Sequence, residues 1–89
     1  MQFHADVRVN PNPKGKVHGH ASVTLMLGAE GQVVIDGFAV IENEGTFWVA
    51  PPARKGDSRY FPVVTLSGKV RADVERAVLD EFERQRKAA

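Results

Sequence analysis

The sequence contains no cysteine among its 89 residues, which excludes disulfides, thiolate catalysis and cysteine-ligated zinc sites. It also lacks any apolar run near the ~20 residues that a membrane-spanning helix needs. Its first residues show no basic segment followed by an apolar one, which is the pattern of a secretory signal. These absences predict a cytoplasmic protein with no membrane partner.

The motifs of common enzyme classes are missing as well. The sequence has no glycine-rich phosphate-binding signature and no Gly-x-Ser-x-Gly elbow. None of its serines has a histidine and an acid at a recognisable spacing, and its paired carboxylates fall in a turn and on a helix surface. We therefore expect a protein that is not an enzyme, with no cofactor and no small-molecule substrate.

The residues that are present fit one globular domain over residues 1–89, with 43% hydrophobic and 26% charged residues. Apolar and polar residues alternate strictly over residues 2–9 and 17–27, which predicts two strands with one buried face each. Residues 32–41 are apolar on both faces, and this pattern is typical of a central strand or a subunit contact. Asp36-Gly37 interrupts that strand and predicts a bulge or a bend.

The second half of the chain changes from strands to a helix. Residues 46–50 and 59–64 read as two more strands, separated by Pro51-Pro52 and a polar, basic loop over residues 53–58. Ser67 is a plausible N-cap for a C-terminal helix, whose apolar residues recur at three- and four-residue spacing. The predicted fold class is α+β, a four- to five-stranded antiparallel sheet followed by one C-terminal helix. Because one helix covers only one face of a sheet, we also expect a homodimer.

Charge is distributed unevenly although the net charge is only +1. Residues 21–50 carry four acids and no Lys or Arg, whereas residues 51–71 carry five bases and one acid. A basic segment can be a phosphate-binding patch, and solvated loop charge is the alternative interpretation. The candidate nucleic-acid-binding residues are Arg54, Lys55, Arg59, Lys69 and Arg71.

Aromatic residues lie close to this basic segment in the sequence. An exposed aromatic side chain there could stack on an unpaired base. Trp48, Tyr60 and Phe61 are the candidates. The alternative interpretation is that Trp48 and Phe61 belong to the core, and for Trp48 we favour the core.

The three histidines of the sequence are candidate ligands for a metal ion. His18 and His20 are two residues apart on a predicted strand, so their rings would share a face. His4 lies on the polar face of the first strand, and three histidines can hold zinc. No acidic second shell is evident nearby, so we favour exposed histidines and predict no metal site.

Several segments resemble the SpoVG family (stage V sporulation protein G, a septation regulator). The chain contains Ala-Ser-Val-Thr-Leu, then an apolar run broken by Asp-Gly, then Gly-Thr-Phe-Trp-Val-Ala-Pro-Pro-Ala-Arg-Lys, and finally Ala-Val-Leu-Asp-Glu-Phe in the helix. The opening Ala-Asp-Val-Arg also fits, and the matching segments are collinear over roughly residues 3–84. The corresponding stretches are residues 21–25, 34–42, 45–55, 77–82 and 5–8.

This resemblance implies a dimer built from a small antiparallel sheet and a C-terminal helix. Members of the family bind DNA and RNA, influence septum formation, sporulation and gene expression, and are not enzymes. Their basic determinants would correspond to Arg54, Lys55, Arg59 and Arg71. The expected function is thus a dimeric nucleic-acid-binding regulator of low sequence specificity.

Two departures from the family pattern bear on this expectation. The loop after Arg54-Lys55 is shortened to residues 56–58, and Asp73 stands where relatives carry a helix lysine. Binding would then be weaker, or shifted to Lys69 and the loop, because each phosphate contact adds to the affinity. The alternative function is a protein-interaction module in cell septation that does not bind nucleic acid.

Overall fold

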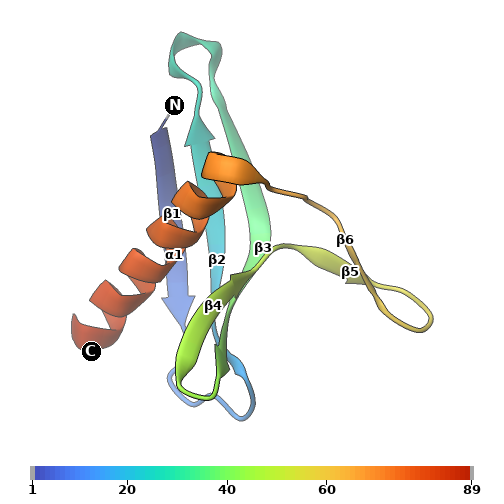
Figure 1. The fold of residues 1–89 in the computed structure, drawn as a ribbon. Helices are drawn as coiled ribbons and strands as arrows, with labels where there is room; N and C mark the ends of the chain where they lie inside the picture. The colour runs from blue at the N-terminus through green and yellow to red at the C-terminus, as the bar shows by residue number, and fades with distance from the viewer. Residues whose placement is uncertain (1, 89) are drawn as a thin grey trace.

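The structure, a computed structural model, describes residues 2–88, apart from the side chains of Lys55 and Pro62. A four-stranded antiparallel sheet with the order β1-β2-β3-β4 is followed by a separate two-stranded sheet and one helix (Figure 1). These elements confirm the predicted α+β class. They are β1 (Gln2–Val9), β2 (Val17–Met26), β3 (Gln32–Asn43), β4 (Thr46–Ala50), β5 (Ala53–Lys55), β6 (Tyr60–Pro62) and α1 (Gly68–Ala88).

Strands β1 and β2 follow the alternation of their side chains. Ala5 lies opposite Val23 and Val7 opposite Ala21, and all four side chains are buried. The short 3-10 turn Gly28–Glu30 then leads into β3, which pairs antiparallel with β2. Because side chains alternate between the faces of a strand, these apolar residues all point to one side of the sheet.

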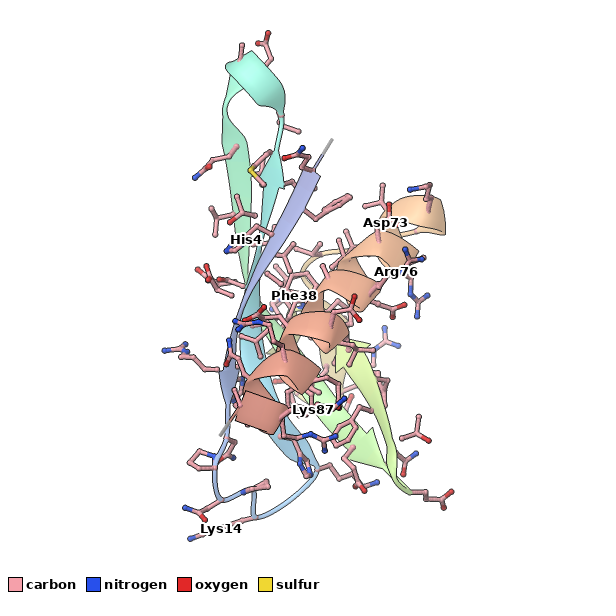
Figure 2. The ribbon with its side chains drawn as sticks, turned by 90° about the vertical axis from the view of Figure 1, so that its left-hand side faces the viewer. His4, Lys14, Phe38, Asp73, Arg76 and Lys87 are labelled. Carbon is pink, nitrogen blue, oxygen red and sulfur yellow. The ribbon has the colours of Figure 1, made fainter. Side chains whose placement is uncertain are left out.

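Helix α1 covers that apolar side of the sheet (Figure 1; Figure 2). Val74, Val78 and Phe82 are its buried residues, and they pack on the buried side chains of the sheet. Phe82 also contacts Phe47 of β4, with the ring centroids 5.0 Å apart. Burying each of these side chains contributes about 1.5–3 kcal/mol to folding. Phe38 lies between sheet and helix, whereas Asp73 and Arg76 lie on the flank of the helix that faces the first residues of β1 (Figure 2).

The predicted interruption of β3 is confirmed as a bulge. The register between β2 and β3 shifts between Ala21 and Val23, where Asp36-Gly37 is accommodated. Gly37 has φ 97°, a conformation that glycine adopts readily and other residues rarely do. A Cβ at this position would lie 3.2 Å from the Cβ of Pro52. The bulge therefore also positions the segment that leaves β4.

The expected fifth strand does not join the main sheet. Pro51-Pro52 ends β4, and the chain then turns away into a hairpin of β5 and β6 that projects from the body (Figure 1). Residues 53–55, which we predicted to be loop, form β5, and the strand predicted over residues 59–64 is shortened to β6. The two pair with each other, with Arg54 opposite Phe61 and Lys55 opposite Tyr60.

The helix begins where the capping pattern predicted. Ser67 precedes the first helical residue, and its carbonyl accepts a hydrogen bond from the Arg71 N–H at 3.3 Å. Arg84 and Arg86 form ion pairs with Glu81 and Glu83, three residues earlier. No helix within residues 2–88 is long and apolar enough to cross a membrane.

Candidate nucleic-acid interface

The projecting hairpin, residues 53–62, carries three of the five predicted basic residues, and we call it the arm. Its turn is closed by a hydrogen bond from the Gly56 N–H to the Arg59 carbonyl at 2.7 Å. The half-buried ring of Phe61 packs directly on Gly56, where a Cβ would collide with the ring edge. The sequence left Phe61 open as a stacking candidate or a core residue, and in the structure it forms the small core of the arm. The arm is therefore a defined hairpin built around one aromatic ring.

Two guanidinium groups lie over this ring. The Arg59 Cζ is 4.7 Å and the Arg54 Cζ 5.5 Å from the Phe61 centroid. Cation–π contacts at such exposed sites stabilise by about 0.5–1 kcal/mol each. Within the described residues neither guanidinium forms an ion pair. The contact with the ring limits the motion of both groups while their N–H donors stay available for an anion.

Lys55 and Tyr60 are the other two candidate contact residues on the arm. Lys55 is placed by its backbone in β5, and its side chain lies outside the described part of the structure. Tyr60 is 68% exposed, which makes it the most exposed large hydrophobic residue on the arm. An aromatic ring beside basic groups is the arrangement that stacks on unpaired bases. In the sequence, Tyr60 is an aromatic neighbour of the basic segment but not one of the predicted site residues.

The remaining two predicted residues lie at the start of α1, and each has an acidic partner one turn further on. Lys69 Nζ is 2.6 Å from Asp73 Oδ2, and Arg71 Nε is 3.5 Å from Glu75 Oε2. The structure thus splits the predicted set into an arm group and a helix group (Figure 1). The two helix cations are locally neutralised. The sequence could have indicated this, because Asp73 and Glu75 follow Lys69 and Arg71 at four-residue spacing.

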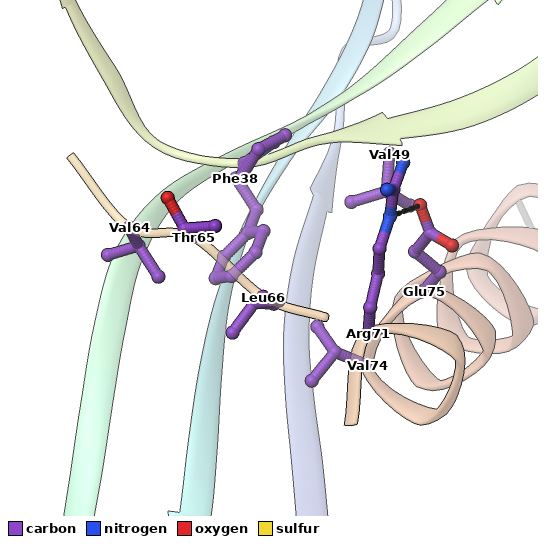
Figure 3. A pocket seen from close by; sticks show the side chains of 9 residues that line it. Phe38, Val49, Val64, Thr65, Leu66, Arg71, Val74 and Glu75 are labelled. Carbon is purple, nitrogen blue, oxygen red and sulfur yellow. Dashed lines mark ion pairs between the residues drawn. The ribbon is translucent and has the colours of Figure 1, made fainter. Parts of the chain in front are cut away.

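A cavity lies at the base of the arm. Its volume is about 230 Å³, and side chains of β3, β4, α1 and the segment joining the arm to α1 line it (Figure 3). Phe38 and Val74 form apolar walls, and the Arg71–Glu75 ion pair lies at one side. No local pattern in the sequence indicates this cavity, since its lining comes from segments far apart in the chain. Arg71 therefore lies beside an apolar cavity and not beside the two arginines of the arm.

The sheet face opposite α1, which we call the open face, carries Trp48. The predicted core position of Trp48 is wrong, since 47% of the residue is exposed. Trp48 pairs with Ile41 of β3, on the opposite side of the sheet from buried Val49. The helix covers only the face of Phe47 and Val49, so the alternating residues of β4 point outward.

The three histidines do not converge. His4 pairs with Thr24, whereas His20 pairs with Arg8, four residues further along β1, a separation of about 14 Å at ~3.4 Å per residue. His18 sits at a register shift of β2, and its ring contacts Phe47 edge-on at 5.4 Å. The same-face placement of His18 and His20 is therefore wrong. Among residues 2–88, no group of three or more potential ligands is arranged to hold a metal ion.

Taken with the fold, this geometry defines a small α+β protein whose distinctive chemistry lies on a projecting basic hairpin. No protein-family model matches the chain. Curated relatives named "Putative septation protein SpoVG" from Clostridium perfringens strains ATCC 13124, 13 and SM101 are each 30% identical to it over 82 residues. The match covers 89% of this chain and 87% of each relative. The chain belongs to the SpoVG family, which confirms the predicted resemblance.

Proposed function

We propose that this chain is a dimeric, non-enzymatic regulator of septation that binds DNA or RNA in the cytoplasm with low sequence specificity. The observation that carries the proposal is the arm, where Arg54 and Arg59 stack on Phe61 beside exposed Tyr60 and form no ion pair with any described residue. Guanidinium groups bind phosphate oxygens, and contacts to phosphate do not read sequence. Septation appears in the names of the relatives.

The arm and the helix group are expected to contribute unequally. Lys69 and Arg71 must each release a carboxylate before they can contact a phosphate, whereas the arm arginines have none to release within the described residues. We therefore assign the main contact to Arg54 and Arg59, with Lys55 on the same hairpin and Lys69 and Arg71 as weaker contributors.

The test is a fluorescence-anisotropy titration with labelled single-stranded and duplex DNA and RNA, in ~50 and ~200 mM salt. Each lost phosphate contact should lower the dependence of log affinity on log salt by about 0.7 to 0.9. The variant Arg54→Ala/Arg59→Ala should therefore bind more weakly and with a shallower salt dependence, for unrelated sequences alike. Lys14→Ala/Lys16→Ala removes the same charge from the exposed β1–β2 turn and is the matched control.

The second candidate function is a protein-interaction module in septation that does not bind nucleic acid. Exposed Trp48 on the open face favours it, since large exposed aromatic residues are frequent at protein interfaces. No binding of any oligonucleotide at low salt would remove the first proposal. Loss of a co-purified protein partner on Trp48→Ala would then support the second.

A further inference from the structure

The cavity at the base of the arm connects the candidate interface to the body of the protein. Phe38, Val49 and Val74 line it from the sheet and the helix. Val64 and Thr65 line it from the segment that leads out of the arm into α1 (Figure 3). A strand of nucleic acid that lies along the arm can therefore place one of its bases at the mouth of this cavity.

The size and walls of the cavity suit a flat ring. Its volume is about 230 Å³, and an apolar cavity of about 150 Å³ can hold a benzene ring. Phe38, Val49 and Val74 are buried members of the core, so packing between the sheet and the helix holds these walls in place. A preformed apolar hollow with a few polar groups is the usual form of a ligand site.

Two charged side chains, Arg71 and Glu75, lie at one side of the cavity. Arg71 Nε is 3.5 Å from Glu75 Oε2, which is longer than an ordinary hydrogen bond. Their side chains are 65% and 36% exposed, so neither group is sealed off by the other. The guanidinium keeps N–H donors on its two terminal nitrogens, and the carboxylate keeps further lone pairs. Both partners can therefore bind a ligand while they remain paired.

This pair restricts the chemistry of the ligand, because its total charge is zero. An anion would be repelled by the carboxylate of Glu75, and a cation by the guanidinium of Arg71. A purely apolar ligand would remove water from both groups and offer them no hydrogen bond in return. A neutral ring with donors and acceptors along one edge satisfies both groups, and an unpaired nucleobase has this chemistry.

We propose that the cavity binds one unpaired guanine of a single strand held by the arm, with the base edge at Arg71 and Glu75. This deepens the proposed function and rests on it. Guanine carries the O6 acceptor beside two neighbouring donors, the ring N1–H and the amino group. The guanidinium can donate to O6 while the carboxylate accepts from the two donors. No other common base offers two neighbouring donors to one carboxylate. The phosphate contacts of the arm stay independent of sequence, so the preference concerns one position only.

The first test compares single strands by fluorescence anisotropy. The probes are an oligothymidine of ~12 nucleotides and the same strand with one central guanine, adenine or cytosine. The guanine strand should bind at least about fivefold more tightly than the others, the lower end of what one good bidentate contact discriminates. Pairing that guanine in a duplex should abolish the gain, because the cavity needs a base outside the stack.

The outcomes separate this proposal from the proposed function. Equal affinity for all of these single strands would overturn the guanine site and leave the arm as a phosphate contact. No binding of any strand in ~50 mM salt would remove both.

Glu75→Gln distinguishes base recognition from charge. The amide removes a negative charge, which should raise the affinity for oligothymidine slightly, but it replaces one acceptor by a donor, so the guanine strand should lose its advantage. Asp80→Asn removes the same charge further along α1, outside the cavity lining, and should preserve the guanine preference. An equal gain for both strands in Glu75→Gln would show that Glu75 acts only through its charge and would overturn the proposal.

A cavity-filling variant provides the second test. Val64→Phe adds a ring to the half-buried connecting segment and should abolish the guanine preference without weakening binding of oligothymidine. Val63→Phe adds the same ring at the next residue, which is 61% exposed and outside the cavity lining, and should keep the preference. Circular dichroism verifies that both variants are folded. A folded Val64→Phe variant with the full guanine preference would overturn the assignment of the cavity.

Discussion

The ring of Phe61 rests on Gly56 so closely that the backbone at residue 56 has no room for a side chain. This contact closes the arm, since the same ring carries the guanidinium groups of Arg54 and Arg59. A glycine in a hairpin turn is common for conformational reasons, but here the requirement is space. The geometry of the candidate interface therefore depends on a residue that has no side chain.

Gly56→Ala tests this dependence. The added methyl group must displace Phe61, and with it the two stacked arginines, so nucleic-acid affinity should fall several-fold. No described residue of the arm belongs to the main hydrophobic core. The midpoint temperature of thermal unfolding should therefore change by no more than about 2 °C. Anisotropy and thermal circular dichroism measure the two effects. Unchanged affinity would mean that the stacking does not orient the arginines, and Ser58→Ala in the same turn is the control.

Tyr60 provides a test of stacking that is independent of charge. Tyr60→Ala should lower affinity for single strands by about 1–3 kcal/mol, the range for one stacked base, and affect duplex binding less. Tyr60→Phe keeps the ring and should bind single strands nearly as well as wild type. If both substitutions weaken binding equally, the hydroxyl rather than the ring makes the contact.

The sheet and the helix were predictable from local patterns. The alternation over β1 and β2 showed which side chains are buried, and Asp36-Gly37 showed where β3 bends. Both patterns depend only on residues that are neighbours in the sequence. The arm was not predictable in this way. Whether residues 59–64 join the main sheet depends on where Pro52 packs against β3, which is a contact between distant segments.

The site shows the same division between local and long-range information. All five predicted basic residues were identifiable by their charge, but their grouping depended on the direction in which the arm leaves the body. Trp48 was misplaced because aromatic residues occupy both faces of β4, and only the position of α1 decides which face is covered. The ion pairs of Lys69 and Arg71 were encoded locally and could have been anticipated.

The core makes a quantitative prediction at Phe82. This side chain is fully buried, contacts Phe47 and lies over the backbone of Gly19. Phe82→Ala should lower the free energy of unfolding by about 3–5 kcal/mol, measured by urea denaturation. Val70→Ala, near the exposed start of the same helix, should cost much less. Equal effects would indicate that α1 is held by its helical propensity rather than by packing.

Acid stability should depend on Glu81. Hydrogen bonds from Arg84 and Gln85 lower the pKa of this carboxyl from its ordinary 4.5 to about 2. A group whose pKa is lower in the folded state stabilises fully above its ordinary pKa, and this contribution is lost as the pH falls towards the lowered value. Glu81→Gln should therefore lower the thermal midpoint at about pH 6 and match wild type near pH 2. Glu44→Gln, in an exposed turn, is the control, and a constant difference at all pH values would contradict this cause.

The carboxylate of Asp73 should limit nucleic-acid binding, because it holds the Lys69 ammonium at 2.6 Å. Asp73→Asn removes the competing charge and frees Lys69 for a phosphate, which should raise affinity about twofold to fivefold in ~50 mM salt and less in ~200 mM salt. Anisotropy titration at both salt concentrations measures the change. Asp80→Asn alters the net charge equally, two turns further along the same helix, and should have a smaller effect. An equal gain from both variants would show that the total charge of the helix matters, and not the release of Lys69.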